Sequence, residues 1–138
     1  MASPNGRQER VERHAATSLR FINQSQAELA KGDALQASEK AWGAAAHAVK
    51  AAAEGRGWNH GTHRLLFDTA ARIADETGDP EFFDLFKVAS ALHQNFYEGW
   101  ESDYTVQKSI ERVKRLVEKV KRLVEKMEAL RLQSTRGA

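Results

Sequence analysis

The segment ALHQNFYEGW, residues 91–100, gathers polar and aromatic side chains that could take part in chemistry. His93 and Tyr97 are four residues apart, so on a helix they share a face and can contact each other. A histidine there could serve as a general base, and its ring or the tyrosine could contact a ligand. Asn95 and Glu98 fall on other faces, so these polar groups do not converge on one point.

The same segment also fits a structural interpretation. Leu92 and Phe96 continue an apolar stripe, so we expect both to be core residues, with His93 and Tyr97 at the margin of a groove or a subunit contact. If the segment binds a ligand, the residues predicted to bind it directly are His93, Asn95, Tyr97 and Glu98, with Lys40 and His47 as neighbours on a preceding helix. Trp42, between those two neighbours, is expected in the core.

Metal chemistry has little support in the sequence. No Glu or Asp stands three residues before any of the five histidines, which removes the di-iron pattern of helical bundles. His60 and His63 have a ligand-like spacing, but a polar loop that starts a helix explains them equally well. We therefore predict no metal site and no cofactor.

Metal-independent RNA cleavage requires only a base that accepts the 2′-OH proton and a cation that binds the phosphate. Arg56 and His63 could supply these groups near the start of one helix, and His93 is the other candidate base. The nucleophile, phosphate-loop, dinucleotide and zinc-protease motifs are absent from the sequence, which disfavours the common hydrolase and nucleotide-cofactor chemistries.

Charge is unevenly distributed along the chain. Residues 1–107 hold 11 Lys and Arg against 15 Asp and Glu, whereas residues 108–138 hold 10 against 4. Cysteine is absent, no apolar run resembles a signal peptide, and no stretch is long and apolar enough for a membrane span. We expect a soluble cytoplasmic protein without a membrane partner.

The hydrophobic pattern predicts helices throughout, separated by a few glycines and one internal proline. The predicted helices cover about 9–31, 33–55, 62–78, 79–99 and a stretch of about 30 residues from Ser102 or Asp103. Asp33, Thr62 and Asp79 are the predicted N-caps, and Pro80 follows the last of these at the first helical position.

The last predicted helix contains VKRLVEKVKRLVEK, a repeat of seven residues. Its apolar positions form one stripe, as in a helix buried against others, and Glu111–Arg115 and Glu118–Arg122 have the spacing of helical ion pairs. Because about 30 residues span about 45 Å, we expect its end to overhang the bundle, pair with another subunit or fray.

Together these patterns predict an all-α protein, an up-and-down bundle of four to five helices with a long C-terminal helix. Its length of 138 residues fits one domain, 1–138, with 1–8 and 132–138 expected to be flexible.

Three segments carry a resemblance to a known family: GDALQASEKAWGAAAHAVKAAAE, HRLLF after the glycine-rich break, and ALHQNFYEGW followed by a long Val/Leu/Lys helix. Over residues 33 to about 125 this pattern resembles the HEPN-like superfamily, and most closely its archaeal and bacterial PaREP branch. The resemblance implies a helical bundle that is often dimeric, in a superfamily that includes metal-independent ribonucleases, toxins of toxin-antitoxin pairs, and non-catalytic binders of nucleotides or RNA.

The sequence departs from the active members of that superfamily. Their arginine and histidine lie four to six residues apart near the start of the final bundle helix, whereas here His93 has no arginine between Lys87 and Arg112. We therefore expect a homodimeric module that binds RNA, a nucleotide or an antitoxin-like protein, with a ribonuclease using a histidine base as the alternative.

Two further possibilities concern the helices themselves. A helical-hairpin scaffold of the tetratricopeptide type would repeat the pattern of residues 32–48 about 34 residues further on, and residues 67–84 do not repeat it. The basic final helix could also contact RNA directly, through Lys114, Arg115, Lys119, Lys121 and Arg122.

Overall fold

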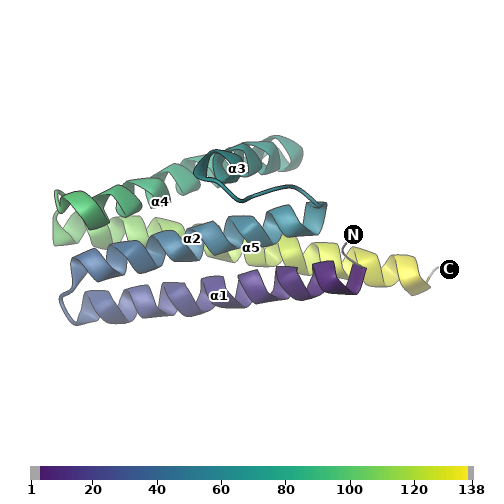
Figure 1. The fold of residues 1–138 in the computed structure, drawn as a ribbon, viewed down its shortest axis with the longest axis horizontal. Helices are drawn as coiled ribbons and strands as arrows, with labels where there is room; N and C mark the ends of the chain where they lie inside the picture. Colours follow the sequence, from purple (N-terminus) through teal and green to yellow (C-terminus); the bar gives the residue numbers. More distant parts are fainter. Residues whose placement is uncertain (1–3, 137–138) are drawn as a thin grey trace.

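The structure, a computed structural model, describes residues 4–136, and these form five α-helices. The helices are α1 (Pro4–Ala30), α2 (Ala34–Arg56), α3 (His63–Thr77), α4 (Glu81–Glu98) and α5 (Asp103–Arg136) (Figure 1). No strand occurs in this part of the chain. The predicted all-α class and the long C-terminal helix are thus confirmed.

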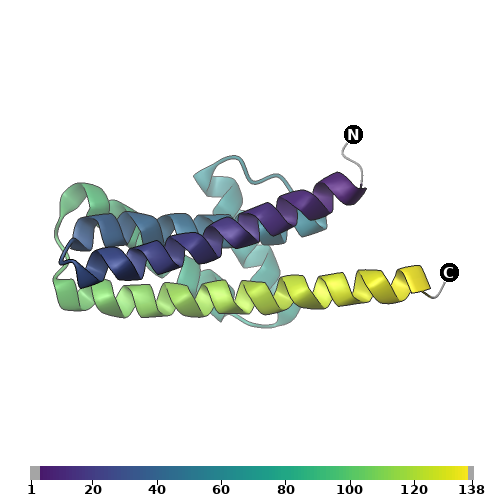
Figure 2. The ribbon, with the colours of Figure 1, turned by 90° about the horizontal axis from the view of Figure 1, so that it is seen from below.

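Four of the helices, α1, α2, α4 and α5, run up and down along one another, and the short α3 is set across them beside α2 and α4 (Figure 1). The last turns of α5 continue beyond α2 on the side where α1 begins (Figure 2). Leu130 and Leu132 are exposed on these turns. Overhang, pairing with another subunit and fraying were the three outcomes expected for the end of this helix, and the structure shows an overhang.

Local capping explains most helix boundaries. Asp33 accepts a hydrogen bond from the Gln36 amide, and Thr62 accepts one from the Leu65 amide, as predicted. The Asp79 carboxylate accepts from the Glu81 amide, although the helix begins one residue later than predicted, after Pro80. These bonds satisfy amide groups that the first turn of a helix leaves unpaired.

Two other boundaries differ from the predictions. Helix α1 begins at Pro4 instead of about residue 9, and Gly55 lies within α2 rather than ending it. Gly57 ends α2 because it adopts the left-handed conformation (φ 72°) that glycine tolerates. Residues 4–8 and 132–136, predicted to be flexible, continue α1 and α5, while 1–3 and 137–138 lie outside the described residues.

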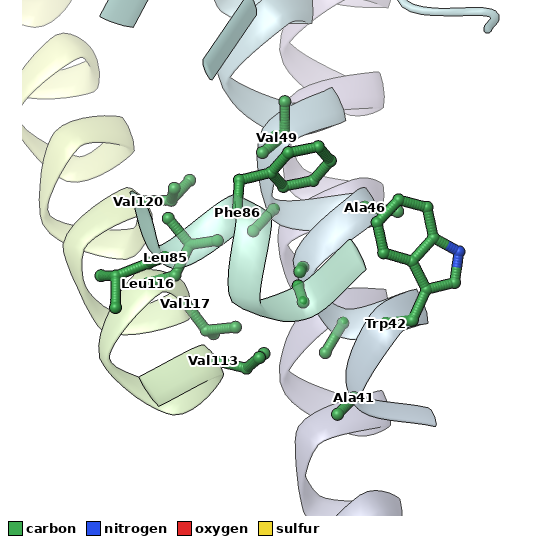
Figure 3. Packing of buried hydrophobic residues seen from close by; sticks show 14 of the residues in the cluster. Ala41, Trp42, Ala46, Val49, Leu85, Phe86, Val113, Leu116, Val117 and Val120 are labelled. Atoms are coloured by element: carbon green, nitrogen blue, oxygen red, sulfur yellow. The ribbon is translucent and has the colours of Figure 1, made fainter. Parts of the chain in front are cut away.

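The core takes buried residues from α1 to α5, and Figure 3 shows its part between α2, α4 and α5. Alanines let the neighbours of α2 approach closely, and this helix is buried along most of its length, as expected for the central helix. Trp42 is a core residue, with 7% of its surface exposed. Near the end of α4, Asn95 is buried and Phe96 is only partly buried, so the expectation that Phe96 belongs to the core was wrong.

Candidate functional site

The structure gathers three of the predicted site residues around Trp42. The His93 ring stacks on the Trp42 ring with centroids 5.1 Å apart, and His63 meets Trp42 edge-on at 5.0 Å. Tyr97 meets His93 edge-on at 5.4 Å, the contact expected from their spacing on one helix. Helices α2, α3 and α4 thus each contribute to this group, which we name the Trp42 cluster.

Glu39 belongs to the same cluster and was not predicted. Its Oε2 lies 3.0 Å from Nδ1 of His93, so the carboxylate fixes the orientation of the imidazole. Both side chains are partly exposed, with 34% and 23% of their surfaces accessible. Glu39 and Trp42 are three residues apart on α2, a spacing that would have placed them on one face.

Asn95, predicted to bind a ligand, is 1% exposed and its amide is already used. Its Nδ2 donates to Ser38 Oγ at 3.2 Å, and its Oδ1 accepts from the Glu101 amide at 2.8 Å. These bonds tie the segment between α4 and α5 to α2 and keep the asparagine away from ligands. Glu98, at the end of α4, is exposed.

The remaining predicted residues lie apart from His93. The Lys40 ammonium is 4.9 Å from the centroid of the Phe21 ring on α1. Arg56 forms an ion pair with Glu76 at 2.8 Å and also donates to the sulfur of Met127. Because His63 packs in the Trp42 cluster instead, the arrangement of Arg56 beside His63 suggested by their spacing does not form.

His47 belongs to a second group of titratable residues, between α1, α2 and the loop after α2. Its Nδ1 lies 3.0 Å from Nδ1 of His14, and Nε2 of His60 lies 3.0 Å from Oε1 of Glu54. The His14 and His60 rings are 5.5 Å apart. We name His14, His47, Glu54 and His60 the histidine cluster. Its members come from distant parts of the sequence, so spacing gave no signal for the group.

Burial is the main cause that lowers the pKa of His47, to about 4, with the positive charge of Lys50 adding to it. The pKa of His14 is also lowered, first by burial and then by the charge of His60. Both imidazoles are therefore neutral at pH 7. Burial would raise the pKa of Glu54, but hydrogen bonds from His60 and Arg10 outweigh it and hold the pKa below its usual value.

The junction of α4 and α5 lies at the other end of the bundle (Figure 1). Three large aromatic side chains are exposed there. Tyr97, Trp100 and Tyr104 have 74%, 66% and 68% of their surfaces exposed, and we name them the aromatic end. Single exposed apolar residues are common, but three within eight positions form a candidate contact surface.

A row of cations begins one turn after Tyr104. Its members follow one another at alternating steps of four and three residues along α5, which places them on one face of the helix. This basic stripe consists of Lys108, Arg112, Arg115, Lys119, Arg122 and Lys126. The ammonium of Lys108 lies 5.4 Å from the centroid of the Tyr104 ring, so the stripe and the aromatic end adjoin.

Half of the stripe is engaged in ion pairs. Arg115 binds Glu81 through two hydrogen bonds of 2.7 and 3.0 Å, and Lys119 pairs with Asp79 and with Glu81. Lys108 pairs with Glu111, so the predicted Glu111–Arg115 pair is replaced by these two contacts.

The other half of the basic stripe can contact a ligand. Arg112, Arg122 and Lys126 are exposed, and within residues 4–136 they form no ion pair or side-chain hydrogen bond. The predicted pair of Glu118 with Arg122 is accordingly not formed in this region. Five cations were predicted to contact RNA. Arg115 and Lys119 are paired and Arg122 is unpaired on the stripe. Lys114 and Lys121 lie on the opposite edge of the exposed face of α5.

No helix within the described residues is both long and apolar enough to cross a membrane.

Comparison with known proteins identifies the class to which this five-helix bundle belongs. The model of the archaeal PaREP1/PaREP8 family matches residues 13–117, from α1 to the middle of α5, and the chain belongs to this family. The crystal structure of a protein from Sulfolobus solfataricus is similar, with 25% sequence identity and a TM-score of 0.69 over 75% of this chain and 92% of that one. No curated protein matches the chain. Membership of the HEPN-like superfamily stays a prediction.

Proposed function

We propose that the protein binds single-stranded RNA through the aromatic end and the basic stripe. The observation that carries this proposal is the continuity of exposed rings with unpaired cations, from Tyr97 through Tyr104 to Arg112, Arg122 and Lys126. Aromatic platforms beside a positively charged track are the usual means of binding single strands, because bases stack on rings while cations contact phosphates.

The dimensions and charges fit this function. At about 1.5 Å per residue, the stripe from Lys108 to Lys126 is about 27 Å long, which allows contact with several successive phosphates. A free nucleotide would use only a small part of this surface. Exposed Trp and Tyr also occur at protein interfaces, but a row of cations of which three have no acidic partner among residues 4–136 favours a polyanion.

The test compares two variants of equal charge. R112Q/R122Q removes two unpaired cations of the stripe, and K114Q/K121Q removes two from the opposite edge of the same helix. Both lower the net charge by two, so non-specific attraction to RNA falls equally in both. Fluorescence anisotropy with a labelled oligouridine at two salt concentrations measures the affinity.

We expect R112Q/R122Q to bind about tenfold more weakly than K114Q/K121Q at low salt, and its salt dependence to be shallower because fewer counterions are released. W100A should also weaken binding, since stacking contributes about 1–3 kcal/mol per base. Equal affinities of the two double variants for RNA would overturn the proposed surface. If the protein binds another protein and not RNA, a protein-binding function would replace the proposed one.

A second candidate function, metal-independent RNA cleavage, is favoured by the contact between Glu39 and His93. A carboxylate that orients an imidazole is a common arrangement for a general base. Cleavage of oligouridine in EDTA that disappears in H93A and is unaffected in H47A would support it. RNA left intact by the wild-type protein would leave binding as the function.

A further inference from the structure

The histidine cluster combines side chains that ligate metals. One candidate ligand atom each from His14, Glu54 and His60 lies within 4.8 Å of the other two. Two imidazoles and one carboxylate form a ligand set found at zinc sites in which a water or substrate occupies the fourth position. These three residues come from α1, α2 and the loop before α3, so a shared ion would join three segments.

We propose that His14, Glu54 and His60 bind a zinc-like divalent transition-metal ion. This inference does not depend on RNA binding, because the cluster lies at the α2–α3 loop and the aromatic end lies at the opposite end of the bundle (Figure 1).

The distances are close to those of a metal centre. Zinc bonds of about 2.0–2.2 Å in a tetrahedron place ligand atoms about 3.3 Å apart. The Glu54 and His60 atoms are already 3.0 Å apart. The widest separation among the three candidate atoms is at most 4.8 Å, so side-chain movements of about 1.5 Å suffice to reach the tetrahedral spacing.

Surrounding contacts resemble those that orient metal ligands. Arg10 donates to Oε2 of Glu54 at 2.9 Å, which leaves Oε1 on the side of His60. His47 contacts one nitrogen of His14, leaving the other nitrogen of that ring for a metal. Ligating histidines and carboxylates usually have such second partners, which fix the ring orientation and the tautomer.

His60 offers one ring nitrogen to the site. Its Nε2, 3.0 Å from Oε1 of Glu54, is the candidate ligand atom. Its Nδ1, on the other side of the ring, is buried without a hydrogen-bond partner among the described residues. Glu54 and His60 also line a surface pocket, which gives an ion access from solvent.

The loop that carries His60 is held in place by its own contacts. The Arg72 guanidinium lies 3.6 Å from the centroid of the Trp58 ring, and the Trp58 amide donates to the Ala53 carbonyl. Gly57 makes the sharp turn out of α2. Loop closure around an ion therefore costs little additional conformational entropy.

Positive charges near the cluster limit the affinity. Arg10 lies beside Glu54, and Lys50 on α2 and Arg13 on α1 act on the imidazoles. One carboxylate offsets part of this charge, and neutral imidazoles bind the softer transition metals in preference to Ca²⁺ or Mg²⁺. We therefore expect Zn²⁺ and Co²⁺ to bind and Mg²⁺ not to bind.

The experiment uses the full chain without an affinity tag, freed of metal by EDTA and dialysed. Co²⁺ is titrated and followed by visible absorption, and Zn²⁺ is titrated by calorimetry. The matched variants are H60A and H63A, which remove two histidines three residues apart, one inside the cluster and one in the Trp42 cluster. E54Q tests the carboxylate, and circular dichroism checks that each variant is folded.

We expect one Co²⁺ or Zn²⁺ per chain in the wild-type protein and in H63A, and at least tenfold weaker binding in H60A and E54Q. H47Q should weaken binding about tenfold by releasing the orientation of His14. Equal affinity of H60A and wild type, equal loss in H60A and H63A, or no saturable binding by the wild type would each overturn the site. If H60A does not fold, the affinity of E54Q for Co²⁺ and Zn²⁺ tests the site, and an affinity equal to that of the wild type would overturn it.

Discussion

At the scale of single residues, Trp42 has two roles, since its ring is nearly buried and also supports His63 and His93. We expect W42A to lower the free energy of unfolding by about 3–5 kcal/mol, because truncation of a buried aromatic ring removes apolar burial and leaves a cavity. Urea unfolding followed by circular dichroism measures the change.

The matched control is W100A, which removes an indole that is 66% exposed. Its effect on stability should stay within about 0.5 kcal/mol, as is usual for surface positions. A loss for W42A no larger than that for W100A would contradict the placement of Trp42 in the core.

Contacts within one helix could be predicted from the sequence, whereas contacts between helices could not. The contact of His93 with Tyr97 followed from a spacing of four within one helix. The histidine cluster depends instead on how α1 packs against α2, and His14 and Glu54 are 40 positions apart in the chain. The burial of Asn95 was not predicted; the residue occupies a place in the apolar stripe of α4, where two hydrogen bonds make its burial favourable.

At the scale of elements, ion pairs connect the start of α4 with α5. Hydrogen bonds from Arg115 are the main cause that lowers the pKa of Glu81, to about 2, and Lys119 contributes further. Lys119 likewise lowers the pKa of Asp79. Because the folded state depresses these pKa values, the unfolded state binds more protons as the pH falls below about 4.5.

The stability that Glu81 contributes should therefore be fully present above about pH 4.5 and be lost as the pH falls toward 2. Urea unfolding between pH 7 and pH 3 should show E81Q less stable than wild type at pH 7, with the difference shrinking in acid. E98Q, a change at an exposed glutamate of the same helix, should follow the wild type throughout. A difference between E81Q and wild type that does not depend on pH would refute the ion-pair explanation.

The elements themselves were largely predictable, since Asp33, Thr62 and Gly99 act as the capping residues that their types indicate. Gly55 was misassigned because a glycine also serves inside a helix where a neighbour approaches closely. A Cβ at Gly55 would lie 2.3 Å from the terminal methyl of Met127 on α5, so the Met127 side chain would have to shift. Only the packing of α5 on α2 distinguishes Gly55 from Gly57, which ends the helix two residues later.

At the scale of the whole molecule, helical periodicity was sufficient to predict an all-α bundle, because apolar positions recur at helical spacing from Val11 to Leu130, and those from Val11 to Val124 contribute to the core. Periodicity does not specify how helices are arranged, and the oblique position of α3 was not predicted. The homodimer and the antitoxin-like partner remain predictions. Analytical ultracentrifugation of the purified chain would test the first of these.

The two proposed sites use different parts of the molecule. The RNA surface follows α5 from the aromatic end, whereas the metal site lies at the α2–α3 loop, at the other end of the bundle (Figure 1). Amide and imidazole NMR spectra of the labelled protein, recorded during separate titrations with oligouridine and with Zn²⁺, test this assignment directly. We expect RNA to shift the signals of residues 97–126 and Zn²⁺ to shift those of His14, Glu54 and His60. Unchanged signals of residues 97–126 on addition of RNA, or perturbation of the same residues by both ligands, would contradict the assignment of two sites.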